Sequence, residues 1–98
     1  MALAEISVIP IGTTTSSIGD WIAEAVKVLE DEEVNYELSP MGTLIEGNIE
    51  DIFRVVGKMH ESAFSKGINR VLTMFTIDDR RDEEVTMKGK VASVKKRL

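Results

Sequence analysis

The order of strand-like and helix-like segments constrains the fold of this chain more than any other feature of its sequence. Three segments have apolar residues at helical spacing, and four shorter segments have the composition or the flanking turn residues of strands. In chain order, we expect a strand at 4–11, a helix at 18–29, strands at 35–39 and 43–47, a helix at 49–66, a strand at 70–77 and a helix at 87–98. The first six elements match the split β-α-β unit. We therefore predict an α+β fold: a ferredoxin-like β-α-β-β-α-β antiparallel sheet with two helices on one face, plus a C-terminal helix.

The chain is 98 residues long, so we expect residues 1–98 to form a single ferredoxin-like domain. It contains no cysteine, which excludes a disulfide framework and a thiolate metal site. No spacing typical of metal ligands stands out, so we expect neither a metal nor a cofactor. The net charge of −5 repels phosphate backbones, and a nucleic-acid partner is therefore not expected.

The N-terminal stretch MALAEISVIPIG differs from a signal peptide, because Glu5 interrupts its apolar run and no basic residue precedes it. No apolar run approaches the ~18 residues that a membrane-spanning helix needs. We therefore expect a cytoplasmic protein without a membrane partner.

The ends of the first two helices carry recognisable signals. Ser17 with Asp20 resembles a capping box before the first helix, and Asn48 with Asp51 behind it is a plausible N-cap for the second. Gly67 is a plausible glycine stop just after the second helix. The acidic run 30–33 opposes the helix dipole, so the first helix is expected to fray there.

Both faces of the predicted sheet are apolar, although two helices can cover only one of them. In the first strand, Ile6 and Val8 oppose Ile9 and Ile11, and in the last strand, Val71, Phe75 and Ile77 oppose Leu72 and Met74. Leaving one apolar set in water would forgo roughly 1.5–3 kcal/mol for each side chain. We expect a second protomer's sheet to cover this face in a homodimer or homotetramer. The alternative is that the C-terminal helix folds back over the face, and both can hold together.

The hairpin around Pro40-Met41-Gly42 contains the candidate ligand-binding glutamates. With an even-numbered turn, we expect Leu38 to pair with Ile45 on the core face and Glu37 to lie opposite Glu46 on the other face. Like charges so placed need a cation, a shared proton or a strong donor between them. This pair is a candidate site for a cationic or amidine-like ligand, and the alternative is a glutamate that is solvated or paired with a surface cation.

The loop 12–17 opens the first helix and is a second, weaker candidate site. Its hydroxyls and free backbone N–H groups are suited to a phosphate or sulfate, but the lysine and glycine pattern of a P-loop is missing. The candidate anion-binding residues are Thr13, Thr14, Ser16 and Ser17. An ordinary capped turn is the alternative.

A few other side chains could have a function. Asp78 and Arg81 lie just past the last strand, close enough to the sheet edge to reach a ligand there, unless the loop is simply solvated and self-paired. Trp21 is expected to line a pocket or an interface or to pack against the C-terminal helix, and His60 is expected to be a partly buried packing residue. With one histidine and no cysteine, a Ser-His or Cys-His catalytic arrangement has little support.

The hairpin also carries the clearest motif of the chain, Tyr36-Glu37-Leu38-Ser39-Pro40-Met41-Gly42-Thr43 followed by Ile45-Glu46-Gly47. It resembles the signature of the small YkoF-like thiamine-binding proteins. Further matches are Pro10 and Gly12, Arg70-Val71 with Thr73 leading into Ile77-Asp78, and Lys90-Val91 with Ser93-Val94. The resemblance implies a ferredoxin-like fold, assembly through the sheets into dimers and often tetramers, and binding of thiamine or its hydroxymethylpyrimidine part without catalysis.

On this basis our first hypothesis is a non-catalytic homo-oligomer that holds thiamine or hydroxymethylpyrimidine at or near the sheet–sheet interface. The expected ligand-binding residues are Glu37 and Glu46 as polar anchors, with Ser39, Met41, Thr43, Thr73, Asp78 and Arg81 around them. The alternatives are an enzyme acting on a small phosphorylated metabolite and a regulatory or scaffold oligomer that binds a protein.

Overall fold

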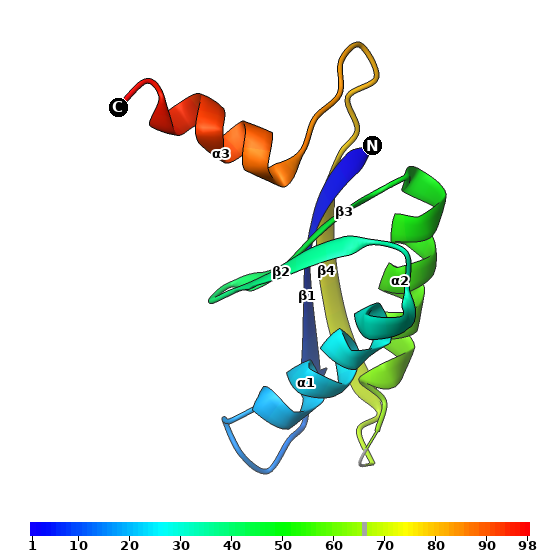
Figure 1. Ribbon diagram of the computed structural model, residues 1–98. Helices are drawn as coiled ribbons and strands as arrows, with labels where there is room; N and C mark the ends of the chain where they lie inside the picture. The colour runs from blue at the N-terminus through cyan, green and yellow to red at the C-terminus, as the bar shows by residue number, and fades with distance from the viewer. Residues whose placement is uncertain (66) are drawn as a thin grey trace.

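A computed structural model describes residues 1–65 and 67–98 and has the predicted order of elements (Figure 1). The strands are β1 (Ala2–Ile11), β2 (Asn35–Ser39), β3 (Gly42–Gly47) and β4 (Arg70–Asp78). The helices are α1 (Gly19–Lys27), α2 (Ile49–Ser62) and α3 (Met87–Lys95), with a 3₁₀ turn, η1, at Val28–Asp31. The four strands form one antiparallel sheet in the order β2-β3-β1-β4. This arrangement confirms the α+β prediction.

The core lies between the sheet and the pair α1 and α2. Alternate residues of β1 face these helices, and the largest fully buried side chains are Ile6, Leu29, Ile45, Ile52, Met59 and Val55. Four of the buried residues come from α2, whose apolar stripe was predicted from helical spacing. In Figure 1, α1 and α2 lie on the same side of the sheet, whereas α3 extends away from it beyond the other side.

The cap predicted for α2 is confirmed, and the one predicted for α1 is wrong. Asn48 accepts a hydrogen bond from the Asp51 amide at 2.9 Å. By contrast, the residue at the cap position of α1 is Ile18 rather than Ser17, and no side chain caps this helix with a hydrogen bond. The Ser17 amide instead donates to the Thr15 hydroxyl at 3.1 Å, so the loop is closed locally before the helix begins.

The ends of the first two helices also follow local hydrogen bonding. The helix α1 passes into η1 at Val28, in agreement with the fraying predicted at the acidic run. The helix α2 ends at Ser62, where the chain tightens into i→i+3 bonds such as that from the Ala63 amide to the His60 carbonyl. Gly67 does adopt a positive φ of 77°, but it lies too far beyond Ser62 to be the glycine stop. The predicted helix end, Lys66, lies outside the described residues.

The register of the hairpin differs from the one predicted. Its turn contains only Pro40 and Met41, so Leu38 pairs with Thr43 and Glu37 with Leu44. The predicted pairing of Glu37 with Glu46 would require the two-residue turn to lie one residue later, at Met41 and Gly42. Glu37 and Glu46 still share one face of the sheet, but as diagonal neighbours rather than as a direct pair.

The second face of the sheet carries exposed apolar side chains, as predicted, and α1 and α2 do not cover it. Met74 is 54% exposed and Leu72 is 47% exposed on this open face. The helix α3 approaches one end of the face but buries none of its own residues. No described helix is long and apolar enough to span a membrane.

Candidate functional site

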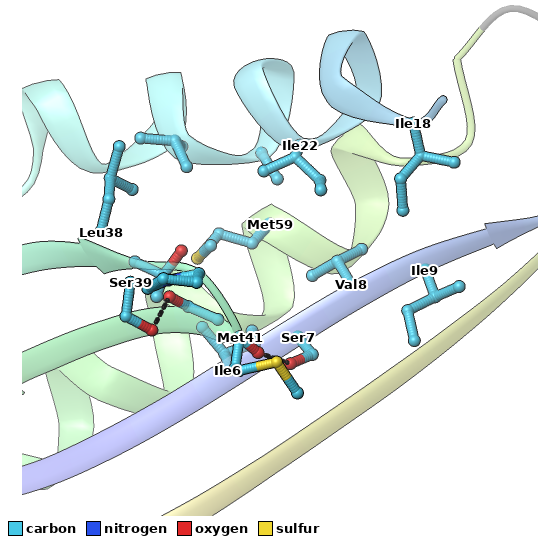
Figure 2. Close-up of a pocket in the computed structure, with 15 residues that line it drawn as sticks. Ile6, Ser7, Val8, Ile9, Ile18, Ile22, Leu38, Ser39, Met41 and Met59 are labelled. Carbon is cyan, nitrogen blue, oxygen red and sulfur yellow. Dashed lines mark hydrogen bonds between the residues drawn. The ribbon is translucent and has the colours of Figure 1, made fainter. Parts of the chain in front are cut away.

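The main cavity of interest is a hollow of about 330 Å³ between α1, the hairpin and β1, which we call the hairpin pocket (Figure 2). Its lining residues are Ile6, Ser7, Val8 and Ile9 from β1, Ile18, Ile22, Ala25 and Val26 in and before α1, the hairpin segment 38–43, and Met59 from α2. Figure 2 shows Ile22 on α1, and Ile18 just before it, on the same side of the strand as Val8, whereas Ile9 points to the other side. The volume is within the range of small-molecule sites.

The pocket exists because β1 and β3 differ in length. Pairing between them ends at Ile6 with Thr43, whereas β1 continues beside β4 as far as Ile11 with Arg70. The hairpin turns back at Pro40, which leaves a notch beside the last part of β1. The first turns of α1 form the roof over this notch.

Close contact with β1 holds the hairpin turn at the edge of the notch. The Ser7 hydroxyl donates to the Met41 carbonyl at 3.1 Å, and the Ser39 hydroxyl donates to the Gly42 carbonyl at 2.8 Å. A Cβ atom at position 42 would lie 3.0 Å from the Ile6 carbonyl oxygen and 3.1 Å from the Ser7 hydroxyl. Glycine therefore permits the approach of the turn to β1.

The walls of the hairpin pocket are apolar and carry no charged side chain among the described lining residues. Its rim is apolar too, since Met41 is 82% exposed and Leu38 is 65% exposed. Two of the polar lining groups, the hydroxyls of Ser7 and Ser39, already bond main-chain carbonyls. Such a site suits the flat, apolar faces of an uncharged ring.

Three of the eight predicted ligand-binding residues, Ser39, Met41 and Thr43, lie together at this pocket. Sequence reasoning missed Ser7, Val8 and the residues of α1. The signal that could have found them is Pro10, since a proline inside a strand marks an unpaired edge.

Glu46, predicted as an anchor, lies on the open face, as expected, and its carboxylate is bonded by other parts of the chain. Glu46 is only 8% exposed. Its Oε2 accepts a hydrogen bond from the Met87 amide at 2.8 Å, and its Oε1 accepts one from Asn35 Nδ2 at 3.3 Å. Met87 is the first residue of α3, where a carboxylate is favoured by the free N–H groups and the helix dipole. In this structure Glu46 therefore fastens α3 to the sheet.

Glu37 and Asp78 line a second cavity, which we call the α3 hollow. It also measures about 330 Å³ and lies on the open face, with Leu44 in its floor and Lys90 of α3 at its border. Lys90 forms an ion pair with Asp78. This cavity is chemically different from the hairpin pocket, because Glu5 adds a third carboxylate to its lining.

Thr73 is not among the described lining residues of either cavity. It lies on the helix-covered face, where its hydroxyl is 2.7 Å from His60 Nδ1. His60 also stacks edge-on against Phe64, which confirms its predicted packing role. Trp21 Nε1 donates to the Ser65 carbonyl at 3.4 Å, so this side chain joins α1 to the segment after α2.

The remaining predicted residues are held by local partners. Arg81 pairs with Asp79 at 2.8 Å in the loop after β4, and this hydrogen-bonded guanidinium lowers the pKa of the Asp79 carboxyl below its ordinary value. In the loop before α1, the Thr13 hydroxyl donates to the Thr15 carbonyl. The anion site at Thr13, Thr14, Ser16 and Ser17 remains a prediction.

The comparisons with known proteins agree with this fold. The model of the family described as thiamine-binding protein matches residues 4–95. This chain is a member of that family. Among members of the UPF0045 group, protein YqgV of Bacillus subtilis is 45% identical over 100% of this chain and 98% of its own length. A UPF0045 protein of Methanothermobacter thermautotrophicus is 40% identical over the full length of both chains.

A solved structure confirms the arrangement of the elements. The crystal structure of hypothetical protein MJ1052 from Methanocaldococcus jannaschii superposes with a TM-score of 0.89 at 28% identity, and the match covers 96% of this chain and 95% of that one. Family membership and this superposition therefore agree on the fold described above.

Proposed function

We propose that this protein binds thiamine or its hydroxymethylpyrimidine part in the hairpin pocket, without catalysis. The observation that carries the proposal is that the hairpin, which holds the family-like motif, builds one wall of a ligand-sized pocket in a chain of the thiamine-binding family. The ligand-binding residues proposed there are Ser39, Met41 and Thr43, together with Ser7 and Val8.

The chemistry of the pocket suits the pyrimidine rather than the thiazolium ring. The pyrimidine is uncharged and flat, so Ile22, Leu38 and Met41 can pack on its faces. The thiazolium cation has no carboxylate among the described residues of the pocket and is expected to remain at the exposed rim. The lack of titratable side chains in that lining also favours binding over acid–base chemistry.

The protein is further proposed to act as a homo-oligomer that assembles through its open face and α3. Leu72 and Met74 on the sheet and Val91 and Val94 on α3 are all about half exposed, which is costly for a single chain. Ser7 and Ile9 point to this face and also line the hairpin pocket, so a partner sheet would lie beside the ligand. A cytoplasmic location is proposed with it.

Isothermal titration calorimetry with thiamine, hydroxymethylpyrimidine and thiamine phosphate tests the binding proposal. Thiamine and hydroxymethylpyrimidine should bind with similar affinity, because the pyrimidine supplies the buried part. Heat from none of the three ligands, in protein that is shown to be folded, would contradict the proposed function.

Two variants locate the ligand. Ile22→Lys puts a cation at the mouth of the hairpin pocket and should weaken thiamine binding at least about tenfold. Glu37→Gln alters only the α3 hollow, so thiamine affinity should stay unchanged. The reverse result would place thiamine in the α3 hollow.

Assembly is tested separately by light scattering on a sizing column. Leu72→Asp introduces a charge into the open face and should yield monomers, while Ile22→Lys, on the helix side, should leave the oligomer intact. A parent protein that is monomeric at micromolar concentration would contradict the oligomer.

A further inference from the structure

The inner edge of β1 has a free stretch that faces the hairpin pocket. Opposite β4, the strand is paired continuously from Leu3 to Ile11. Opposite β3, its pairing ends at Ile6, because the neighbouring strand begins at Gly42. Val8 is therefore a central-strand residue on one side and an edge residue on the other.

Two independent observations show which main-chain groups point to the free side. The carbonyl oxygen of Ile6 lies 3.0 Å from the position of a Cβ at Gly42, so Ile6 directs its main-chain groups toward β3. Main-chain groups alternate in direction along a strand, so those of Val8 point the same way and those of Ile9 point to β4. Pro10 supports this assignment. By the same alternation its main-chain groups point to the free side, where no neighbouring strand needs an N–H donor and a proline is tolerated.

Val8 thus presents one donor, its N–H, and one acceptor, its C=O, side by side at the pocket wall. Other polar groups of the wall are less available, because the hydroxyls of Ser7 and Ser39 are both bonded to carbonyls of the hairpin. A buried ligand must still satisfy its polar atoms, or it loses about 1–3 kcal/mol for each one. The main chain of β1 is in a position to do this, next to the hydroxyl of Thr43, which also lines the pocket.

We propose that the main chain of Val8 reads the polar edge of the ligand, and that the pocket selects planar heterocycles with an acceptor nitrogen next to an amino group. An aminopyrimidine has this pattern, and it would extend the sheet in the place of the missing β3 residue. The inference rests on the proposed function, since it names the recognition mode of the same pocket.

Hydrogen exchange of single amides, followed by nuclear magnetic resonance, tests the inference directly. In the free protein, the Val8 amide should exchange at least about tenfold faster than the Ile9 amide, which is bonded to β4. Saturation with thiamine should slow the exchange of the Val8 amide at least about tenfold and leave the exchange of the Ile9 amide unchanged. Equal protection of Val8 and Ile9 in the free protein would overturn the assignment, and so would thiamine binding that leaves Val8 exchange unaltered.

A pair of variants gives a second test. Val8→Pro removes the N–H from the free side and should weaken thiamine binding about tenfold or more. Val8→Ala keeps the N–H and serves as the control for the lost side chain. It should therefore bind thiamine clearly more tightly than Val8→Pro does. Equal affinities in two folded variants would overturn the inference, and if Val8→Pro does not fold, the exchange of Val8 in the parent protein decides.

Ligand analogues separate this inference from the proposed function. A thiamine analogue that lacks the amino group should bind at least about tenfold more weakly than thiamine, because its acceptor nitrogen has no donor beside it. If neither compound binds, the proposed function itself is wrong. If both bind equally, the protein binds thiamine but does not read it through Val8.

Discussion

The hairpin pocket and the α3 hollow have the same volume, about 330 Å³ each, but their polar groups come from different sources. The hairpin pocket has uncharged side chains and a strand edge, whereas the α3 hollow has the carboxylates of Glu5, Glu37 and Asp78. One therefore suits a neutral ring with an ordered hydrogen-bond pattern, and the other suits a cation. The comparison teaches that volume alone does not identify the ligand site in a chain of this size.

The two cavities also differ in how firmly their walls are held. The hairpin pocket is bounded by the sheet, by α1 and by a turn in close contact with β1. The α3 hollow is bounded on one side by a helix without a buried residue, attached through Glu46 and Lys90. A short helix with few buried contacts is only marginally stable by itself. Tight binding is easier to obtain in the pocket that already has its shape.

The largest effect is expected from Gly42→Val, which should damage the hairpin pocket and spare the α3 hollow. The added Cβ would meet the main chain of Ile6 at 3.0 Å, so the turn has to move away from β1. We expect about 1–3 kcal/mol of lost stability in denaturant unfolding, together with loss of thiamine binding in calorimetry.

Gly57→Val is the matched control for this substitution. Nothing lies within 4 Å of a Cβ at Gly57, which is exposed on α2, and valine is a better helix residue than glycine. The stability of this control should stay within about 0.5 kcal/mol of the parent. Equal losses for the two variants would mean that the contact of the turn with β1 has no special importance.

The register of the hairpin shows what the sequence could and could not predict. Apolar alternation placed Ile6 and Ile9 on opposite faces of the sheet, and Phe75 and Met74 likewise, because a strand has a period of two. The predicted pairing of Leu38 with Ile45 differs from the observed pairing with Thr43 by two residues, and such a shift leaves every side chain on the same face. The hydrophobic pattern could therefore give the faces but not the partners.

The hairpin pocket was only partly predictable for a related reason. Its residues Ser39, Met41 and Thr43 were proposed from the motif, but Val8 and Ile22 come from distant segments. They meet only because β3 ends before β1 does, and that difference in length follows from tertiary pairing rather than from local propensity. The role of Glu46 was missed because nothing in the spacing shows that its carboxylate caps a helix 41 residues later.

An intermediate effect is expected from Glu46→Gln, which should loosen the α3 hollow and spare the hairpin pocket. An amide accepts the hydrogen bond of the Met87 amide less strongly than a carboxylate does, and it adds no charge to the start of α3. The loss of stability should be about 1 kcal/mol, with faster hydrogen exchange of the Met87 amide. Thiamine affinity should not change, and a large decrease would return Glu46 to the role of ligand anchor.

The smallest effect is expected from salt, and it distinguishes the two cavities without any substitution. The described walls of the hairpin pocket carry no charge, so thiamine affinity there should change less than about twofold between about 0.05 and 0.5 M salt. In the α3 hollow, three carboxylates and one lysine leave a net negative lining, and a bound cation would be attracted mainly by exposed, screened charges. A steep decrease of affinity with salt in titration calorimetry would therefore favour the α3 hollow. A flat profile would favour the hairpin pocket, because a site that reads its ligand by shape and by main-chain hydrogen bonds has little screened attraction to lose.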